Sequence, residues 1–535
     1  MSGPDSRRWW ALIAIAASVV VVGLDLTVLS LALPTLARDL HASTSDLQWF
    51  SDAYTLVLAA AVLPAGLLGD RLGRKKVLLV ALVLFGISSA ACAYATSSGE
   101  LIAARAVLGL GAAAILPLSL SILPVLFTAD ERPKAIAIMA SATFLSFPVG
   151  PLLGGWLLDN FWWGSVFLIN VPVVALALIA VAFLMPESRS SQRPRMDFAG
   201  VVIAGAGLTT LTYGFITAGQ KGWGDATSMA TIAAGVVLLV AFVAWERRIT
   251  SHGGQPLVDL SLFSSAGFTW GTILTALISF ALFGILFAMP LFFQDVRGLN
   301  ALGSGLRLLP MIGGMVIGMI GGSRLQSPRK GPDGSMIPPP VSVKALVTVG
   351  YLVMAAGLAI GTFTHTGSST GFTVAWFAVT GLGLGIAMPA AMNAAIGALS
   401  AERSGSGTAL ITAMRQVGAT IGVAVLGTVI SDAYRNQLHL AGAPAAAATA
   451  VRSSIGAGVQ VAHALGSASL LSMVRDAYVH GLDIMLWACA GIALASALLA
   501  LAFLPRRAGA PVQAPVPAAG VAAAVDQAQQ AELGG

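Results

Sequence analysis

The stretch GLLGDRLGRKK, residues 66–76, lies between two long apolar segments and interrupts them with glycine and charge. Its glycines permit a tight turn. Its aspartate can sit at a helix N-terminus or pair with an arginine, and its basic residues hold the turn in the cytoplasm. A loop that serves topology alone needs the basic residues but not this order of glycine, aspartate and arginine. The residues of interest are Gly66, Gly69, Asp70, Arg71, Gly73 and Arg74.

Composition places the rest of the chain in a membrane. The 535 residues are 57% hydrophobic and only 10% charged, and the mean hydropathy is +0.86. A soluble protein carries about 25% charged residues. About fourteen apolar runs of 18 or more residues recur along the chain, and each is long enough to cross the hydrocarbon core. We therefore predict an all-α polytopic membrane protein with fourteen transmembrane helices.

The basic residues predict its orientation. With the N-terminus in the cytoplasm, 20 of the 29 Lys and Arg residues fall in cytoplasmic segments, seven fall outside and two lie within spans. Cytoplasmic loops carry an excess of Lys and Arg, so we expect both termini on the inner side of the cell membrane. The net charge of +6 then reflects topology and not nucleic-acid binding.

Two similar segments recur along the chain. GLGAAAILP begins at Gly109 and GLGLGIAMP begins at Gly381, and a short loop containing Glu-Arg follows each. Such self-similarity indicates a transporter built from parallel repeats. The expected organisation is a cytoplasmic tail at 1–8, a six-helix half at 9–186, two linker helices at 187–261, a second six-helix half at 262–505 with a long external loop at 432–477, and a disordered cytoplasmic tail at 506–535.

Two aspartates interrupt the apolar spans. VVVVGLDLTVLSLALP, residues 19–34, contains Asp25, and WFSDAYTLVL, residues 49–58, contains Asp52. A carboxylate at bilayer depth costs roughly 2.5–3.5 kcal/mol, and the rise of two antiparallel helices brings both acids to a similar depth. Each is either a satisfied polar residue that holds helices together or a proton carrier, because apolar surroundings favour the neutral form of a carboxyl group. The bare form would also serve as the counter-ion of a lipophilic cation.

At this point the sequence resembles a known family. The 66–76 turn looks like the signature loop of the major facilitator superfamily, and further motifs narrow the likeness to its fourteen-span drug:proton antiporters, which include quaternary-ammonium exporters. The resemblance covers roughly residues 9–505. The further motifs are LDLTVLSLALP (24–34), LIAARAVLGLGAAA (101–114), VGPLLGG (149–155), FLINVP (167–172) and the pattern Glu246…Pro256-Leu257…Leu262-Phe263.

The sequence departs from this family in two places. The family often has Trp-Arg-Trp shortly before FLINVP, where this chain has Trp163-Gly164-Ser165. The echo of the signature loop in the second half, near Gly322 to Lys330, is degenerate and carries a Pro-rich insertion.

The resemblance implies the major facilitator fold, with two six-helix halves, and a role for each motif. The 66–76 turn would be a conformational gate, and the antiporter motif would comprise Gly150, Pro151, Gly154 and Gly155. Proton coupling and substrate charge would fall to Asp25, Asp52 and Arg105, with Arg105 near Asp25. Two plainer interpretations stay open: a lone arginine in a span can be a static strut bonded to helix carbonyls, and small residues such as those of VGPLLGG let helices pack closely.

A pocket for hydrophobic drugs needs an apolar and aromatic wall. Arg415 is the only charge that we find in the spans of the second half, so we expect poor recognition of dications. The candidate pocket residues are Trp49, Tyr54, Phe144, Phe147, Trp270, Phe283, Phe287 and Arg415.

The predicted function is a proton-coupled antiporter that exports amphipathic, monocationic or neutral drugs or antibiotics across the cell membrane. The alternative keeps the fold and exports an endogenous metabolite, such as an amino acid, a peptide or a lipid-like compound. No Walker A sequence occurs, which argues against an ATP-driven pump, and no cluster of His, Cys and acids suggests an enzyme. We expect no metal and no cofactor, because the proton gradient drives transport. The expected partners are a small-molecule cargo, protons and the lipid bilayer, and we expect a monomer that binds no nucleic acid.

Overall fold

A computed structural model describes residues 6–128, 130–189, 196–327, 329–330, 336–337, 340–399, 404–440 and 444–505. Within these residues, fourteen helices are long and apolar enough to cross a membrane, which confirms the predicted number. The tail predicted at 506–535 lies outside the described residues, as do residues 1–5 of the tail predicted at 1–8.

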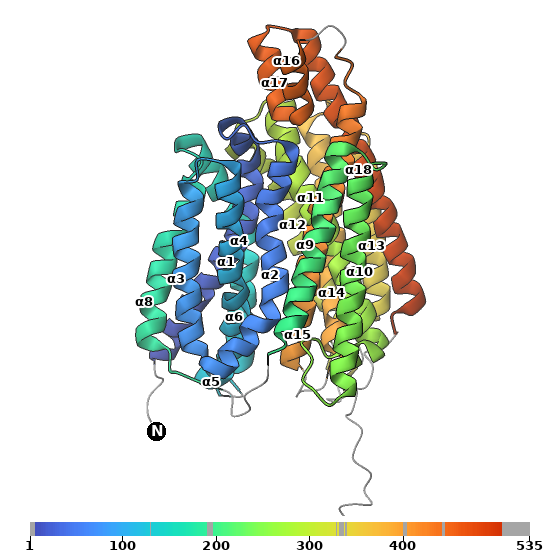
Figure 1. Cartoon of the computed structure of the whole chain (residues 1–535). Helices are drawn as coiled ribbons and strands as arrows, with labels where there is room; N and C mark the ends of the chain where they lie inside the picture. The colour runs from blue at the N-terminus through green and yellow to red at the C-terminus, as the bar shows by residue number, and fades with distance from the viewer. Residues whose placement is uncertain are drawn as a thin grey trace, which may run out of the picture.

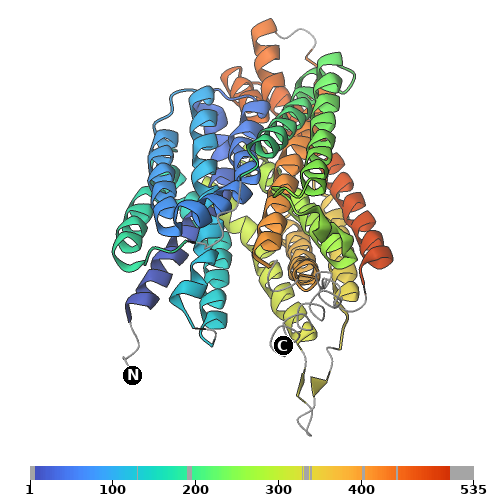
Figure 2. The ribbon, with the colours of Figure 1, turned by 60° about the horizontal axis from the view of Figure 1, so that its bottom comes forward.

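The first half of the chain forms one side of the molecule (Figure 2). Side-chain caps begin its second and fourth long helices: Ser43 and Asp46 form a capping box, and Ser97 accepts a hydrogen bond from the backbone of Glu100. Such caps satisfy the orphan amide groups of a helix start. The elements are α1 (Ser6–Asp39), α2 (Thr44–Leu72), α3 (Arg74–Ala93), α4 (Ser98–Ser121), α5 (Leu123–Leu126), α6 (Arg132–Asn160), α7 (Ser165–Leu168) and α8 (Asn170–Leu184).

Two linker helices, α9 (Phe198–Lys221) and α10 (Ala226–Ser251), follow, and the rest of the chain forms the opposite side of the molecule (Figures 1 and 2). The elements of this second half are η1 (Leu260–Ser264), α11 (Ala266–Leu291), the π-helical turn η2 (Phe292–Val296), α12 (Ala301–Gln326), the short strands β1 (Arg329–Lys330) and β2 (Met336–Ile337), α13 (Val343–Gly361), α14 (Thr370–Ile396), α15 (Ser404–Asn436), α16 (Ala445–Ser453), α17 (Ile455–Ala464) and α18 (Ala468–Phe503).

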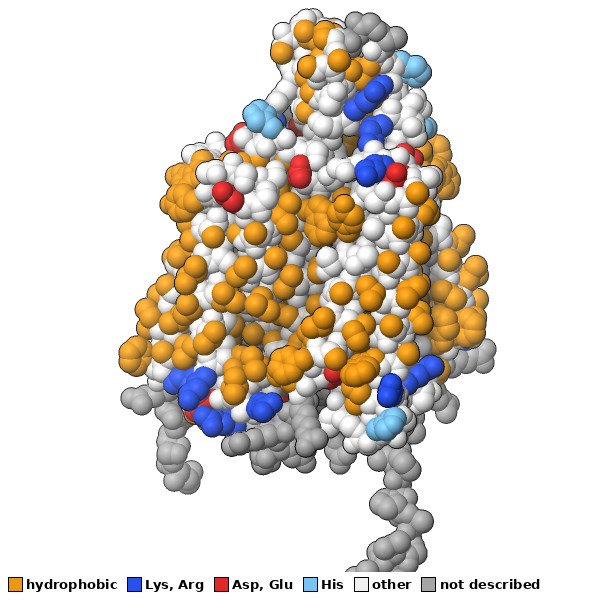
Figure 3. Space-filling view, viewed as in Figure 1, with side chains coloured by type: hydrophobic (Ala, Val, Ile, Leu, Met, Phe, Trp, Pro, Cys, Tyr) orange, Lys and Arg blue, Asp and Glu red, His pale blue; other side chains and the backbone are white. Residues whose placement is uncertain are grey.

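The segment predicted as a long loop at 432–477 is largely helical. Its start belongs to α15 and its end to α18, and between them α16 and α17 form a cap. The cap stands at the opposite end of the molecule from the first turn of α1 (Figure 1). We call these the cap end and the motif end, since the 66–76 turn lies at the latter. Lys and Arg side chains gather at the motif end of the face in Figure 3, beyond a belt of apolar side chains. The predicted orientation places the cap end outside the cell.

The repeated glycine motif packs in the same way in both halves. Gly109 of α4 lies against the backbone of Tyr54 in α2, and Gly381 of α14 lies against the backbone of Met311 in α12. A Cβ atom at either glycine would clash with that backbone. Two residues further on, the next glycine of each motif faces α3 or α13. The short repeat in the sequence therefore marks a repeated three-helix packing.

Asp159, at the end of α6, joins the two halves at the cap end. Its carboxylate accepts hydrogen bonds from Asn300 Nδ2 at 2.6 Å and from the backbone amides of Ala301 and Leu302 at 3.0 and 3.2 Å, where α12 begins. The negative charge of this carboxylate is also stabilised by the positive end of the α12 dipole.

The other hydrogen bonds between described residues of the two halves also lie between the cap end and the middle of the helices. From the middle of the helices to the motif end, no hydrogen bond between described residues joins the first half to the second. The two halves are therefore closed against each other at the cap end. The bonds join Thr44 with Ser453, Gln48 with Val423 and Ala424, Gln294 with Leu31, and Thr420 with Thr55.

Candidate proton and substrate site

Asp25 and Arg105 form a buried ion pair in the centre of the first half. Asp25 lies on α1 and Arg105 on α4, and Arg105 Nη1 donates to Asp25 Oδ2. Both side chains are closed off from the surface. Arg105 Nε also donates to the carbonyl of Phe50 at 2.9 Å. The structure thus brings together two residues that the sequence analysis expected to be neighbours, and it gives the arginine a strut-like bond as well.

Aromatic rings enclose the guanidinium group of Arg105. Its Cζ lies 4.5 Å from the centroid of the Tyr54 ring and 6.0 Å from that of Phe167. Cation–π attraction in such desolvated positions is worth about 2 kcal/mol. The rings therefore help to hold a charge that burial alone would disfavour.

The Asp25 carboxylate keeps one oxygen without a hydrogen bond. Oδ1 is buried and has no partner among the described residues. The side chain of Asn170 lies near the Asp25 carboxylate, and its Nδ2 donates to Ser89 Oγ at 3.1 Å. Asn170 belongs to the FLINVP segment, so the motif held a signal for a residue near the ion pair to which the sequence analysis gave no role.

The antiporter motif lies against the helix that carries Asp25. Gly150 of α6 faces Thr27 Oγ1 of α1, and Gly154 faces Val28. Gly155, on the other hand, faces the backbone of Leu302 in the second half. The motif is a close-packing patch, and it packs at the contact between the halves, which is where alternating access requires movement.

A small central cavity adjoins the ion pair between the two halves. It measures about 20 Å³, which leaves room for about one water molecule and none for a drug. The cavity is small because the halves are in contact around it, and a drug-sized cargo requires them to separate at one end. The lining residues are Leu26, Leu29, Ser30, Ser51, Thr55, Arg105, Phe283, Leu286, Phe287 and Val423.

The predicted pocket residues occupy several environments. Phe283 and Phe287 line the central cavity with Arg105. Tyr54 is fully buried beneath Arg105, and Trp270 stacks on Phe503 of α18 with ring centroids 4.4 Å apart. The remaining aromatic candidates, Trp49, Phe144 and Phe147, are partly buried and do not line the cavity in this closed arrangement.

Asp52 has no visible partner. It is fully buried, and neither carboxylate oxygen forms a hydrogen bond with a described residue. Its neighbours along the same face of α2 contact other parts of the protein: Thr55 bonds to Thr420 of α15 at 2.8 Å, and Leu56 packs with Leu208 of α9. An unpaired buried carboxylate is costly, and binding a proton removes that cost.

The 66–76 turn is an ordered structure at the motif end. Arg74 donates to Asp70 Oδ1 through Nε at 2.9 Å and Nη2 at 2.8 Å. Gly73 has a φ of +119°, which is a conformation that favours glycine, and a Cβ there would clash with the carboxylate of Glu187. Glu187, after α8, also accepts a hydrogen bond from the Lys75 backbone at 3.2 Å. The aspartate–arginine pairing that the sequence permitted is therefore present.

The second half carries more charge than the sequence analysis predicted. The prediction that Arg415 is the only charge in those spans is wrong. Asp295 lies in the span that covers α11 and η2, and 5% of its surface is exposed. The span of α18 adds Arg475, Asp476 and Asp483. Arg415 itself has a buried Nε without a hydrogen-bond partner.

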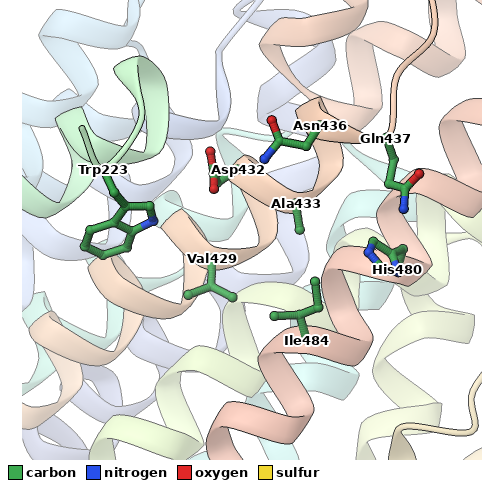
Figure 4. Close-up of a pocket in the computed structure, with 8 residues that line it drawn as sticks. All are labelled: Trp223, Val429, Asp432, Ala433, Asn436, Gln437, His480 and Ile484. Carbon is green, nitrogen blue, oxygen red and sulfur yellow. The ribbon is translucent and has the colours of Figure 1, made fainter. Parts of the chain in front are cut away.

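A larger cavity of about 400 Å³ lies toward the cap end, between the α9–α10 turn, α15 and α18. Figure 4 shows Asp432, Asn436, Gln437 and His480 around it, with Val429 and Ile484 on one side. All of its lining residues belong to the linker or to the second half. A site that alternates between the two sides of a membrane must lie between the halves, so this cavity is not the candidate site. Among the described residues, no group of three or more His, Cys, Asp or Glu residues is arranged to hold a metal ion.

The chain is similar in sequence to known membrane transporters. Residues 15–423 match the Major Facilitator Superfamily. The tetracenomycin C resistance and export protein of Streptomyces glaucescens is 32% identical over 533 residues, which cover 97% of this chain and 96% of that protein. The multidrug efflux pump LfrA of Mycolicibacterium smegmatis is 34% identical over 484 residues, which cover 89% and 92%.

A solved structure supports the fold. A bacterial homolog of the human lysosomal transporter Spinster, in an inward-facing and occupied conformation, matches with a TM-score of 0.65. The match covers 96% of this chain and 100% of that chain at 16% sequence identity. At this identity the likeness shows the fold alone.

Proposed function

The chain belongs to the Major Facilitator Superfamily, and from that premise we propose that it is a proton-coupled antiporter that exports amphipathic drugs or antibiotics. It is a multi-pass membrane transporter and not an enzyme. The names of its relatives favour drugs and antibiotics as cargo over amino acids or peptides. The observation that carries the proposal is the buried Asp25–Arg105 pair beside a cavity between the halves.

The ion pair suits exchange because one carboxylate can serve two cations. With a proton on Asp25, the carboxyl group is neutral, and Arg105 keeps its bonds to the Phe50 carbonyl and to the aromatic rings. With the proton released, Asp25 is an anion beside an apolar cavity and attracts a lipophilic cation. Proton and cargo then compete for one group, which is sufficient for antiport.

Charge balance limits how the exchange is driven. One proton exchanged for one monovalent cation moves no net charge, so only the pH gradient drives it. The membrane potential contributes about 2.3 kcal/mol per charge per 100 mV only when a second proton enters or the cargo is neutral. Asp52, buried and unpaired, is the candidate carrier of that second proton.

Alternating access requires that the cap end, which is closed here, opens in another state of the cycle. The hydrogen bonds of Asp159 and Gln48 hold the halves together there, so cargo would enter from the motif end, once the halves separate further on that side. If the cap end faces outward, as the basic residues predict, this is the state that loads cargo from the cytoplasm. Opening the cap end then requires the Asp159 bonds to break.

Proteoliposomes with an imposed pH gradient test the proposal. Adding a lipophilic monocation such as ethidium should release protons through the wild-type protein but not through Asp25→Asn, because the amide keeps the shape of the side chain and cannot carry a proton. Asp39→Asn makes the same change at the exposed end of the same helix and should transport normally. Normal pH-driven transport by Asp25→Asn would refute the assignment.

A further inference from the structure

Asp295 is a buried acid at the cap end that the mechanism above does not use. It lies in the π-helical turn η2 that ends α11, and 5% of its surface is exposed. Its Oδ2 is buried and has no hydrogen-bond partner, and no described residue donates to its other oxygen. A π-helical turn within a helix often marks a functional position, and an unpaired buried acid in a span calls for an explanation.

Two arginines lie near Asp295 without pairing with it. Arg38, at the end of α1, and Arg475, on α18, attract its charge electrostatically, but neither forms a salt bridge with it. Arg38 Nε donates instead to the carbonyl of Pro34 at 3.1 Å, and Arg475 Nε is buried without a partner. The charges that would neutralise a carboxylate are present but out of contact.

The hydroxyl groups near Asp295 are also used elsewhere. Tyr434 of α15 donates to the carbonyl of Val451 at 2.8 Å, and Tyr478 of α18 donates to that of Ala288 at 2.8 Å. Arg297, directly after η2, donates to the carbonyls of Thr366 and Ser368. The described surroundings therefore leave the carboxylate without a donor.

Asp295 lies where both halves and the cap meet. The preceding residue, Gln294, donates to the Leu31 carbonyl of α1 at 2.9 Å. Gly456 of α17 approaches both Ala37 of α1 and Asp295, since a Cβ on this glycine would lie 3.5 Å and 3.7 Å from them. When the halves separate at the cap end, α1 must leave α17 and η2, and water then reaches the Asp295 carboxylate.

A comparison with Asp159 shows what is unusual here. Both acids lie at the closed contact between the halves. Asp159 is exposed and accepts three hydrogen bonds, so its charged form stabilises the closed state. Asp295 is buried and accepts none, so its charged form opposes closure, because a carboxylate that is largely removed from water without a partner is destabilised.

We propose that Asp295 is a further proton-binding site, separate from Asp25 and Asp52, which takes a proton from the solution at the cap end as the halves close there and returns it when they reopen. The carboxylate accepts the proton from hydronium and water is released, so no other reactant is needed. The site adds no net proton movement across the membrane; it makes closure depend on the acidity outside. Acid at the cap end favours the closed state, and alkali favours opening.

Thiol labelling can measure this closure. Cys92 and Cys489, the two native cysteines, are buried and can be replaced by alanine. Ser51, which lines the central cavity, then becomes a reporter as Ser51→Cys, because a membrane-impermeant methanethiosulfonate cation reaches it from outside only while the cap end is open. The labelling rate of the reporter protein with native Asp295 is compared with that of the same protein carrying Asp295→Asn, at the same external pH. The effect of pH on the ionisation of the reporter thiol is then the same in both and cancels in the ratio of the rates.

The expected ratio of the wild-type rate to the Asp295→Asn rate is above one at pH 5.5, because a solvated carboxyl group of the open state is already ionised there. The ratio rises at least fivefold by pH 8, since one proton shifts an equilibrium by up to about tenfold per pH unit. The Asn variant mimics the protonated form and should stay closed at every pH. Asp295→Leu, which is also neutral, should behave like Asn. A ratio that does not change with pH would overturn the proposal.

Two further variants separate this site from the others. Asp159→Asn should raise labelling at every pH, because it loses a closing contact, while the pH dependence of the Asp295 ratio persists. The inference rests on alternating access and not on proton coupling through Asp25, so the ratio should keep its pH dependence in an Asp25→Asn background even where antiport is lost. Disappearance of the pH dependence in that background would assign it to Asp25 and refute the proposed site at Asp295.

Discussion

The two halves of the molecule share a scaffold and differ at its centre. In the first half, Arg105 lies four residues before Gly109, and in the second half Phe377 lies four residues before Gly381. Because both glycines pack against the second helix of their own half, the repeat aligns a fully buried arginine with a fully buried phenylalanine.

The partners of these two residues differ accordingly. Arg105 pairs with Asp25, whereas the ring of Phe377 lies 4.2 Å from that of Trp376 and 6.0 Å from that of Phe293. At this position the first half thus holds an ion pair, and the second half holds a cluster of aromatic rings. One helix packing therefore supports both a charged pair and an apolar cluster.

The largest expected effect comes from giving the first half the residue of the second. Arg105→Phe leaves Asp25 buried without its cation, and breaking a buried pair in this way costs about 3–5 kcal/mol. We expect a lower unfolding temperature in detergent and no proton-coupled efflux. The double variant Arg105→Phe with Asp25→Asn should recover the thermal stability but not the efflux, because no charge is then left unpaired.

Phe377→Leu is the matched control in the second half. Leucine is smaller than phenylalanine and leaves some space unfilled, which costs roughly 1–2 kcal/mol by comparison with other large-to-small core substitutions. The number of protons exchanged per cargo should not change. If Phe377→Leu altered proton coupling as strongly as Arg105→Phe, the assignment of proton coupling to the ion pair of the first half would be wrong.

Much of this arrangement could be predicted from the sequence. Apolar length gave the fourteen spans, and the isolation of Asp25 and Arg105 in apolar segments indicated that each needs a partner. Asp295 was missed because QDVRG, after a proline and two phenylalanines, has the polarity of a loop. Its burial depends on α1, α17 and α18, which approach it only in the folded molecule. The stacking of Trp270 on Phe503 likewise joins residues more than two hundred positions apart.

The next effect concerns the turns after the second helix of each half. Asp70→Ala removes the acceptor of both Arg74 bonds, and we expect turnover to fall roughly tenfold, equivalent to about 1.4 kcal/mol in the barrier, with little change in equilibrium drug binding. Arg324→Ala, in the degenerate counterpart of the second half, changes an exposed side chain at the end of α12 and should leave turnover nearly unchanged. A tenfold loss of drug binding in Asp70→Ala would show that the turn shapes the site and is not a gate.

The smallest expected effect concerns the charge of the cargo, and it tests whether the charges of the second half reach the site. Asp295 lies at the cap end and does not line the central cavity, so its presence adds no counter-ion there. A monovalent lipophilic cation can neutralise one of Asp25 and Asp52 and leave the other to carry a proton. A rigid dication needs both acids, and an unpaired positive charge in low-dielectric surroundings is penalised. We therefore expect efflux of a matched monocation to exceed that of the dication several-fold.

Arg415→Gln should narrow the difference between the two efflux rates only if that side chain faces the opened cavity. Equal rates, or a preference for the dication, would mean that an acid of the second half takes part in binding, and Asp295→Asn would then be the variant that restores the preference.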